Sequence, residues 1–409
     1  MSAPLLTSSG GIYQLEWADE AVAMRLDRLT EDSKYNVTAE VAIKSRIPGV
    51  HPHIHQARLN LTSTTARNTI SKYLAERLPA MAWHGMIEQA CVLVLDKYRE
   101  GAPVIALAGH PMPEGLQFRL KPFLQERQNS LFFGEGDTGK SWLLIYMGIL
   151  VSHGITIHGM DAEPGAVLYL DYETDEDTLW DRVNRISQAL DVPIPENFFY
   201  RQTFQTLAAD IDQINRVVLE NKISLVIVDS ASPAVGEAES SQMTTDYFRA
   251  LRSLRIATAT IAHVSKGGKE NEPFGSIFWR NLPRANFRVN ASHEPGDDSF
   301  VIGLKHTKSN NGQRLKDMAF QIDFGDDGVS FNPATVTDYP DLAKGLSLGQ
   351  RISAALLKGG MTVKELAETL DENSEVIRKT LNRGKGRFFQ QLDTNMGQPH
   401  WGNLATDTN

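Results

Sequence analysis

The feature that most constrains this chain is the segment Gly134–Ser141, which reads Gly-Glu-Gly-Asp-Thr-Gly-Lys-Ser. It fits the pattern GxxxxGK[ST] at every fixed position, and apolar runs at 131–133 and 142–150 flank it. A strand, a glycine-rich loop and a helix in this order bind phosphate, because backbone N–H groups and the helix N-terminus converge on phosphate oxygens. We therefore expect an α/β fold with a nucleotide site at this loop.

The loop also predicts which residues contact the nucleotide. Lys140 is expected to reach the β- and γ-phosphates, and the Ser141 hydroxyl is expected to ligate Mg²⁺. ATP and Mg²⁺ are therefore the expected cofactors. The residues expected to line the nucleotide are Gly134, Glu135, Gly136, Asp137, Thr138, Gly139, Lys140, Ser141 and Trp142.

Two further apolar runs end in acidic residues. Asp229 follows the run at 223–228 and is expected to be the second metal ligand. Asp171 and Glu173 follow the run at 166–170, and strand alternation predicts that both point to the same side. Glu173 is the candidate for polarising the attacking water as a general base. The alternative is that Glu173 only caps the next helix.

The loop, the strands ending at Glu173 and Ser230, and the later segment Thr260-Ile-Ala-His-Val-Ser-Lys266 come in a characteristic order. Over about residues 115–330 they resemble the RecA-like ATPases of the RepA-type hexameric helicase group, AAA-family proteins with a C-terminal winged helix. The resemblance implies that Glu173 is the catalytic base and that His263 senses the γ-phosphate and couples it to the DNA loops. The alternative for His263 is a structural residue at a strand end.

In such ATPases the loop after His263 lines a central pore and contacts single-stranded DNA. Lys266 and Lys269 would then meet phosphates, and Phe274 would stack on a base. Glu270 and Glu272 in the same loop leave open the alternative of an ordinary surface loop.

Basic residues after this loop are candidates for a finger that reaches the ATP of a neighbouring subunit. Arg280, Arg284 and Arg288 are spaced four apart, so on a helix they would share one face. The resemblance adds the basic end of the strand at 300–308. An arginine finger stabilises transition-state charge, whereas a solvated surface charge is the alternative for each residue. The trans-finger candidates are Arg280, Arg284, Lys305 and Lys308.

The chain is expected to form three domains. Residues 1–112 read as a small α+β domain, with strands at 36–44 and 56–61 and helices at 63–77 and 83–98. Residues 113–340 would be the RecA-like P-loop NTPase core, and 341–409 a winged-helix-like domain of three short helices and a hairpin. In the first domain, His51, His53 and His55 would share one face of a strand, a geometry that can hold a metal, although Pro52 argues against it.

The last domain gathers positive charge in its second half, on a segment that resembles a helix–turn–helix. These charges form a local footprint for DNA phosphates, and a protein-docking winged helix is the alternative. The residues are Arg378, Lys379, Arg383, Lys385 and Arg387.

Composition narrows the partners and the compartment. The 41 Lys and Arg residues against 50 Asp and Glu give a net charge of −9, so DNA contacts must be local rather than spread over the surface. The single cysteine excludes an intrachain disulfide, and no apolar run approaches the roughly 20 residues that a membrane-spanning helix needs. The first residues have neither a basic n-region nor an apolar h-region of secretory length, so we expect no export signal. We expect a cytoplasmic protein without a membrane partner.

The leading hypothesis is an ATP-driven DNA translocase of helicase type that acts in replication or repair. It would work as a homo-oligomer, a ring or a filament, because a trans finger needs a second subunit. Its partners would be DNA, preferentially single-stranded, and a replication or repair protein. The alternatives are a RecA-type recombinase or recombination mediator, or a nucleotide-controlled oligomeric DNA-binding regulator. The sequence predicts no task for residues 1–112.

Overall fold

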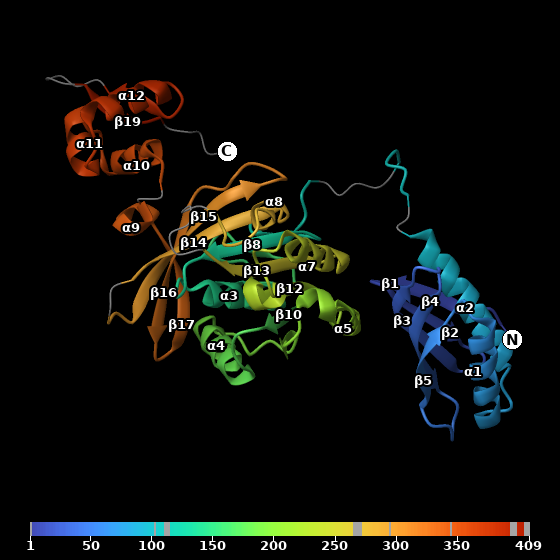
Figure 1. Cartoon of the computed structure of the whole chain (residues 1–409). Coiled ribbons are helices and arrows are strands. Elements are labelled where there is room, and N and C mark those ends of the chain that lie inside the picture. Colours follow the sequence, from blue (N-terminus) through green and yellow to red (C-terminus); the bar gives the residue numbers. More distant parts are fainter. Residues whose placement is uncertain are drawn as a thin grey trace. The chain divides into compact units, whose positions relative to one another are not determined.

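A computed structural model describes residues 2–101, 104–109, 115–264, 272–293, 296–343, 346–392 and 399–404. The chain divides into two compact units. Unit 1 comprises Met1–Gln117, Gln205–Ile223 and Arg249–Arg255, and unit 2 comprises Phe118–Phe204, Ser224–Phe248 and Ile256–Asn409. Figure 1 shows both units and labels most of their elements.

Unit 1 begins with a five-stranded antiparallel sheet whose strands follow one another in sequence order. One face of this sheet forms an apolar core with two helices, in which Trp17 and Trp83 are fully buried. Ser63 caps the first of these helices by accepting a hydrogen bond from Ala66 N. The elements are β1 (Leu5–Ser9), β2 (Ile12–Trp17), β3 (Val22–Glu31), β4 (Val37–Ser45), β5 (His53–Asn60), α1 (Thr64–Arg77) and α2 (Trp83–Glu100). Helix α5 (Leu207–Glu220) belongs to the same unit.

Strands β1 to β3 precede the first strand that the sequence predicts, at 36–44. β1 is largely exposed and contains two serines and a threonine, so its sequence shows none of the alternation of a half-buried strand. It is a strand because it pairs with β2 from Leu5↔Glu16 to Ser9↔Ile12. Pairing across a turn, rather than local hydrophobicity, decides its conformation.

The three histidines of this unit do not form a metal site. Strand β5 begins only at His53, and the pairing with β4 shifts register between Ile43 and Lys44. The Nδ1 atom of His51 lies 3.1 Å from the backbone oxygen of His53, so this ring faces its own chain. Across the described ranges, no group of three or more His, Cys, Asp or Glu side chains could hold a metal ion.

Unit 2 is built on a nine-stranded mixed sheet in the order β11-β10-β12-β13-β8-β14-β15-β16-β17. Strands β10 and β11 are parallel, as are β12, β13, β8 and β14, whereas β15 to β17 continue the sheet antiparallel. A large, mostly parallel sheet of this kind fits a P-loop NTPase core. The strands are β8 (Asn129–Gly134), β10 (Ala166–Asp171), β11 (Phe198–Gln202), β12 (Ile223–Asp229), β13 (Ala257–His263), β14 (Ala285–Ser292), β15 (Ser299–Ser309), β16 (Met318–Gly325) and β17 (Gly328–Ala334). A small sheet of β6 (Phe118–Lys121), β7 (Leu124–Gln125) and β9 (Asp161–Ala162) adjoins them in sequence.

The order of the parallel strands determines which residues meet. Because β13 lies between β8 and β12, the end of β13 separates the loop after Gly134 from Asp229. In the β13–β8 pairing His263 lies directly opposite Gly134. The carboxyl ends of parallel strands share one edge of a sheet, which is where such folds bind ligands.

Helices cover the sheet according to strand alternation. Ile261 belongs to the apolar core that contains the buried side chains of α3 and α4, whereas the neighbouring Thr260 bonds the Tyr247 hydroxyl of α7 on the opposite side (2.9 Å). Helix α3 is apolar on all sides and is almost entirely buried, as expected of a helix in a large core. The helices are α3 (Lys140–His153), α4 (Glu176–Ala189), α6 (Ala231–Val235) and α7 (Ser241–Ser253).

The C-terminal segment has a small core of its own, formed by Ile352, Leu356, Leu366, Ile377, Leu381, Phe389 and Trp401. Capping boxes at Ser347/Gln350 and Thr362/Glu365 start two of its helices. Its elements are η1 (Val336–Asp338), α9 (Pro340–Ala343), α10 (Leu348–Ala355), η2 (Leu356–Lys358), α11 (Val363–Leu370), α12 (Ser374–Gly384) and the antiparallel pair β18 (Phe389–Leu392) and β19 (His400–Asn403). The winged-helix interpretation of this segment stays a prediction.

The three arginines spaced four apart do not lie on one helix, so the condition under which they would share one face is not met. Arg280 lies in the one-turn helix α8 (Phe278–Asn281), Arg284 follows it, and Arg288 lies in β14. Pro283 has no N–H to continue the helix, and β14 pairs with the central strand β8. In the described part of the chain, none of the helices combines the length and apolarity needed to cross a membrane.

Candidate nucleotide site

The loop between β8 and α3 has the backbone of an anion cradle. A Cβ atom on Gly134 would lie 2.1 Å from the Val289 carbonyl oxygen, so only glycine fits there. Asp137 (φ 58°) and Gly139 (φ 76°) adopt left-handed conformations, and α3 starts immediately afterwards at Lys140. In a turn with such left-handed residues, successive backbone N–H groups face one concave side, where anions bind.

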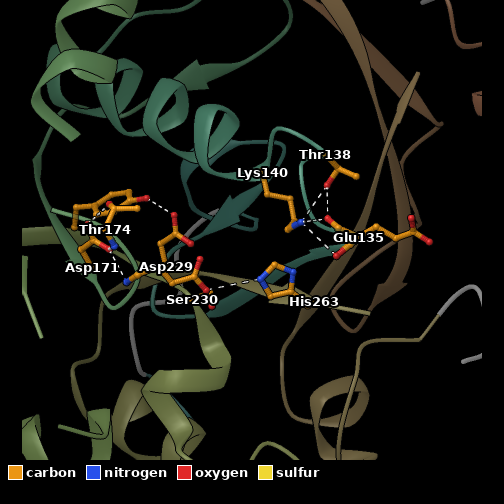
Figure 2. Close-up of polar contacts among 11 residues, drawn as sticks. Glu135, Thr138, Lys140, Asp171, Thr174, Asp229, Ser230 and His263 are labelled. Carbon is orange, nitrogen blue, oxygen red and sulfur yellow. Dashed lines mark hydrogen bonds and ion pairs between the residues drawn. The ribbon is translucent and has the colours of Figure 1, made fainter. Parts of the chain in front are cut away.

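The Lys140 side chain folds into this loop. Its Nζ donates hydrogen bonds to Gly134 O (3.2 Å), to Thr138 Oγ1 (3.0 Å) and to the Glu135 carbonyl, as Figure 2 shows. Burial lowers the pKa of Lys140 to about 8, against the opposing influence of the Asp229 and Glu173 carboxylates. A cation so poorly solvated would be stabilised strongly by phosphate oxygens.

Asp229 and Ser141 form the pair that the sequence predicts for the metal. Asp229 ends β12 and is 6% exposed, and burial raises the pKa of its carboxyl group, whereas hydrogen bonds from Tyr169 and Ser141 lower it. The Tyr169 hydroxyl donates to Asp229 Oδ2 at 2.5 Å. The peptide bond from Asp229 to Ser230 is cis. A hydroxyl beside a carboxylate is a hard oxygen donor set, so the two residues fit Mg²⁺, which keeps several of its waters.

Glu173 contacts Ser230 and His263, which lie at the ends of the neighbouring strands β12 and β13. Its Oε1 accepts a hydrogen bond from the Ser230 hydroxyl and lies 3.8 Å from His263 Nε2. The interaction with the His263 imidazole, supported by Ser230 and Lys140, holds the pKa of Glu173 below its usual value despite partial burial. The group is therefore ionised at neutral pH, as a residue that polarises water must be.

Asp171 does not share the orientation of Glu173, because β10 ends at Asp171 and the strand alternation stops there. Its Oδ1 accepts from the backbone N atoms of Glu173 and Thr174, both at 2.9 Å, and its Oδ2 accepts from the Thr174 hydroxyl. Figure 2 shows Asp171 and Thr174 together on the side of Asp229 away from Lys140. Asp171 thus shapes the turn that presents Glu173. The cap of α4 is Asp175, whose Oδ1 accepts from Thr178 N (2.8 Å), so Glu173 does not cap that helix.

A cluster of cationic and aromatic side chains lies beside the loop, and of its members only Trp142 was predicted from the sequence. The Arg182 guanidinium lies 5.3 Å from the centre of the Trp142 ring, and Arg185 lies 5.8 Å from that of Phe324. Trp142 and Phe324 meet edge to face at 5.2 Å, and Phe324 stacks on Phe300. All of these side chains are half-buried, so part of each remains at the surface next to the start of α3. The spacing of Arg182 and Arg185 on α4 was the sequence feature that could have indicated this cluster.

The trans-finger candidates differ in how far they are engaged within their own chain. Lys308 Nζ donates to the carbonyl oxygens of Asn281 (2.7 Å) and Pro283 (2.5 Å), and burial lowers its pKa to about 8. Arg280 is exposed and pairs with Glu272 (Nη1 to Oε1, 2.9 Å). Arg284 is exposed and Lys305 is half-buried. Arg280 and Arg284 are thus the two better presented to a neighbour.

The DNA candidates fall into two places. Lys266 and Lys269 lie outside the described residues, but the end of their loop is seen, where Phe274 N donates to the His263 carbonyl (2.9 Å). The C-terminal candidates are all exposed: Arg378, Lys379, Arg383, Lys385 and Arg387. Among them, Lys379 lies 3.5 Å from Glu375, and Lys385 bonds Gln391 Oε1. Arg387 lies over the ring of the exposed Phe388.

A sequence-family model described as an AAA domain matches residues 103–271. This match supports a P-loop ATPase. The matched range runs from before β8 through β13, so it contains the phosphate loop and the strand ends that carry Glu173, Asp229 and His263. A search of curated proteins found no match. An ATPase domain implies nucleotide binding, typically with Mg²⁺, and the site described above has the residues for both.

Proposed function

We propose that this chain is an ATP-hydrolysing DNA translocase of helicase type that acts as a homo-oligomer in replication or repair. The observation that carries the hydrolytic part is the meeting of Lys140, Asp229, Glu173 and His263 at the ends of adjacent strands. Each side chain comes from a different segment, and each has the chemistry that phosphoryl transfer requires.

In the proposed mechanism the loop N–H groups and Lys140 bind the β- and γ-phosphates. Ser141 and Asp229 would hold Mg²⁺, which when bound neutralises the charge that develops on the phosphates. Glu173 is a carboxylate kept ionised by His263 and Ser230, and it orients and deprotonates the attacking water. An arginine from a neighbouring subunit, Arg280 or Arg284, would stabilise the transition state.

The cluster of Trp142, Arg182, Arg185 and Phe324 is proposed to bind the nucleobase. It adjoins the N-terminus of α3, where the phosphates would bind. It offers guanidinium and aromatic groups that can stack on a flat heterocycle. Such stacking tolerates any base, so we expect this cluster to discriminate only weakly between ATP and other nucleoside triphosphates.

Coupling to DNA is proposed to run through His263. Its imidazole faces Glu173, while its carbonyl accepts the backbone N–H of Phe274 at the end of the candidate DNA loop. The same stretch is tied to the loop after α6, because the Ala238 carbonyl accepts from Ser276 N (3.0 Å) and from Trp279 Nε1 (3.0 Å). A shift of His263 upon hydrolysis would therefore move both loops together.

The exposed basic residues of α12 and the turn after it are proposed to add a second DNA contact. Arg378, Lys379 and Arg383 occupy one helix, and Phe388 next to Arg387 offers a stacking surface. Charge and an aromatic face together suit single-stranded DNA, and we place the protein in the cytoplasm, where such DNA arises during replication and repair.

Translocation tests this proposal directly. The protein with ATP and Mg²⁺ is expected to displace streptavidin from biotin at one end of a DNA single strand, and not from the other. Lys140→Ala, which removes the phosphate contact, should not displace it. Hydrolysis without displacement from either end would favour a nucleotide-controlled regulator instead.

A further inference from the structure

We propose that Tyr169 is a positioning residue for the metal site: its hydroxyl fixes the carboxylate of Asp229 so that this group meets Mg²⁺ in one orientation. The inference rests on the proposed function, because it concerns the same nucleotide site. It adds a residue that neither the loop motif nor the apolar strand pattern indicates.

The contact is short and lies in the interior. Tyr169 OH donates to Asp229 Oδ2 at 2.5 Å, across the neighbouring strands β10 and β12. Both residues are almost fully buried, at 2% and 6% exposure. A hydrogen bond to a carboxylate is among the stronger ones in proteins, and most buried tyrosine hydroxyls have a hydrogen-bond partner.

The geometry restricts how the carboxylate can turn. One oxygen, Oδ2, is engaged by Tyr169, and a hydrogen bond from Ser141 reaches the same carboxylate. Rotation about the Cβ–Cγ bond of Asp229 would break the contact with Tyr169. Partners of this kind orient metal ligands, and their loss typically lowers metal affinity by about 10- to 100-fold.

Tyr146 provides a matched control within the same unit. It is also a buried tyrosine, 1% exposed, with its ring stacked on Phe331 at 4.2 Å. Its hydroxyl is buried and, in the described part of the chain, has no hydrogen-bond partner. Tyr146→Phe and Tyr169→Phe remove the same atom from similar surroundings, and only the second removes a contact to Asp229.

The experiment measures binding rather than turnover. The fluorescence of mant-ATP is titrated with the full-length protein in excess Mg²⁺ and in EDTA, and the ratio of the two Kd values gives the gain due to the metal. Tyr169→Phe is expected to reduce this gain by about tenfold while Kd in EDTA stays unchanged, because the loss affects the metal ligand alone. Tyr146→Phe should retain the full gain.

An unchanged gain in Tyr169→Phe would overturn the inference. So would an equal loss in EDTA, which would indicate general damage to the site. As a second measurement, Tyr169→Phe is combined with Asp229→Asn, and the inference predicts no further loss in the double variant, whereas additive losses contradict it. If the wild-type protein does not bind mant-ATP at all, the proposed function fails first, which distinguishes the two.

Discussion

His263 Nε2 lies 3.8 Å from the Glu173 Oε1 that accepts the Ser230 hydroxyl, so one carboxylate oxygen joins the ends of three strands. β13 carries His263, β12 leads into Ser230, and the turn after β10 presents Glu173. In register, His263 is also the partner of Gly134 at the start of the phosphate loop. Under the proposed function, this position would let a single imidazole respond to changes at the phosphates and at the candidate base.

Glu173→Gln is expected to bind ATP and not hydrolyse it. The amide keeps the shape and the hydrogen bond from Ser230 but cannot take a proton from water, and the loss of a general base costs about 10²- to 10⁴-fold in kcat. The measurement is steady-state phosphate release together with mant-ATP binding. Glu176→Gln, an exposed carboxylate in the first turn of α4, is the matched control and should hydrolyse normally. Normal turnover in Glu173→Gln would move the base elsewhere.

His263→Ala is expected to shift the pH profile of hydrolysis. The imidazole is the main influence that lowers the pKa of Glu173, so its removal raises that pKa. A base acts only when deprotonated, and the acid limb of kcat/KM should therefore move to higher pH. DNA should also stimulate this variant less than the wild type. An acid limb at the wild-type pH would show that His263 does not influence the base.

At alkaline pH, nucleotide binding is expected to be coupled to the uptake of a proton by Lys140. In the free protein burial lowers the pKa of this group to about 8 from its ordinary 10.5, whereas phosphates favour the ammonium form. Above pH 8 the lysine must gain a proton to bind, so affinity should fall by up to about tenfold per pH unit toward 10.5, and Lys140 contributes no such dependence below 8. Calorimetry at pH 9 in two buffers of different ionisation enthalpy measures the uptake. Equal heats in both buffers would refute it.

Arg182→Ala is expected to weaken the binding of ATP but not of tripolyphosphate. The guanidinium lies over Trp142 and would stack on the base, a contact worth about 0.5–2 kcal/mol, or roughly 2- to 30-fold in Kd. Tripolyphosphate carries the same phosphates without a base, so competition against mant-ATP by each ligand separates the two effects. Equal weakening of both ligands would argue against a base-binding role.

The sequence predicted those parts of the site that local patterns encode. The phosphate loop, Asp229 and Glu173 each follow an apolar run, and the rule that parallel strands share an edge brings them together, as the structure shows. Their roles remain predictions. Asp171 departs from the alternation argument because the strand ends at Asp171 itself, two residues before Glu173.

The remaining features depend on contacts between distant residues. Tyr169 meets Asp229 only because β10 and β12 are neighbours, and no spacing in one sequence reveals strand order. The hydrogen bond from Lys308 to the carbonyl oxygen after α8 also joins residues that are far apart in the sequence. Leu5–Ser9 is a strand because it pairs with the next strand, and its own residues do not reveal that pairing. Arg280, Arg284 and Arg288 would share one face only on a helix, and Pro283 and the pairing of β14 with β8 prevent one.

Steady-state ATP hydrolysis with and without single-stranded DNA is the decisive measurement for a DNA-driven ATPase. It should be run at low salt, because contacts to phosphates weaken as salt rises. We predict Mg²⁺-dependent hydrolysis that DNA stimulates at least several-fold, and no hydrolysis by Lys140→Ala in either condition. Hydrolysis that DNA leaves unchanged would contradict a DNA-driven motor, and hydrolysis that survives in Lys140→Ala would contradict the site itself.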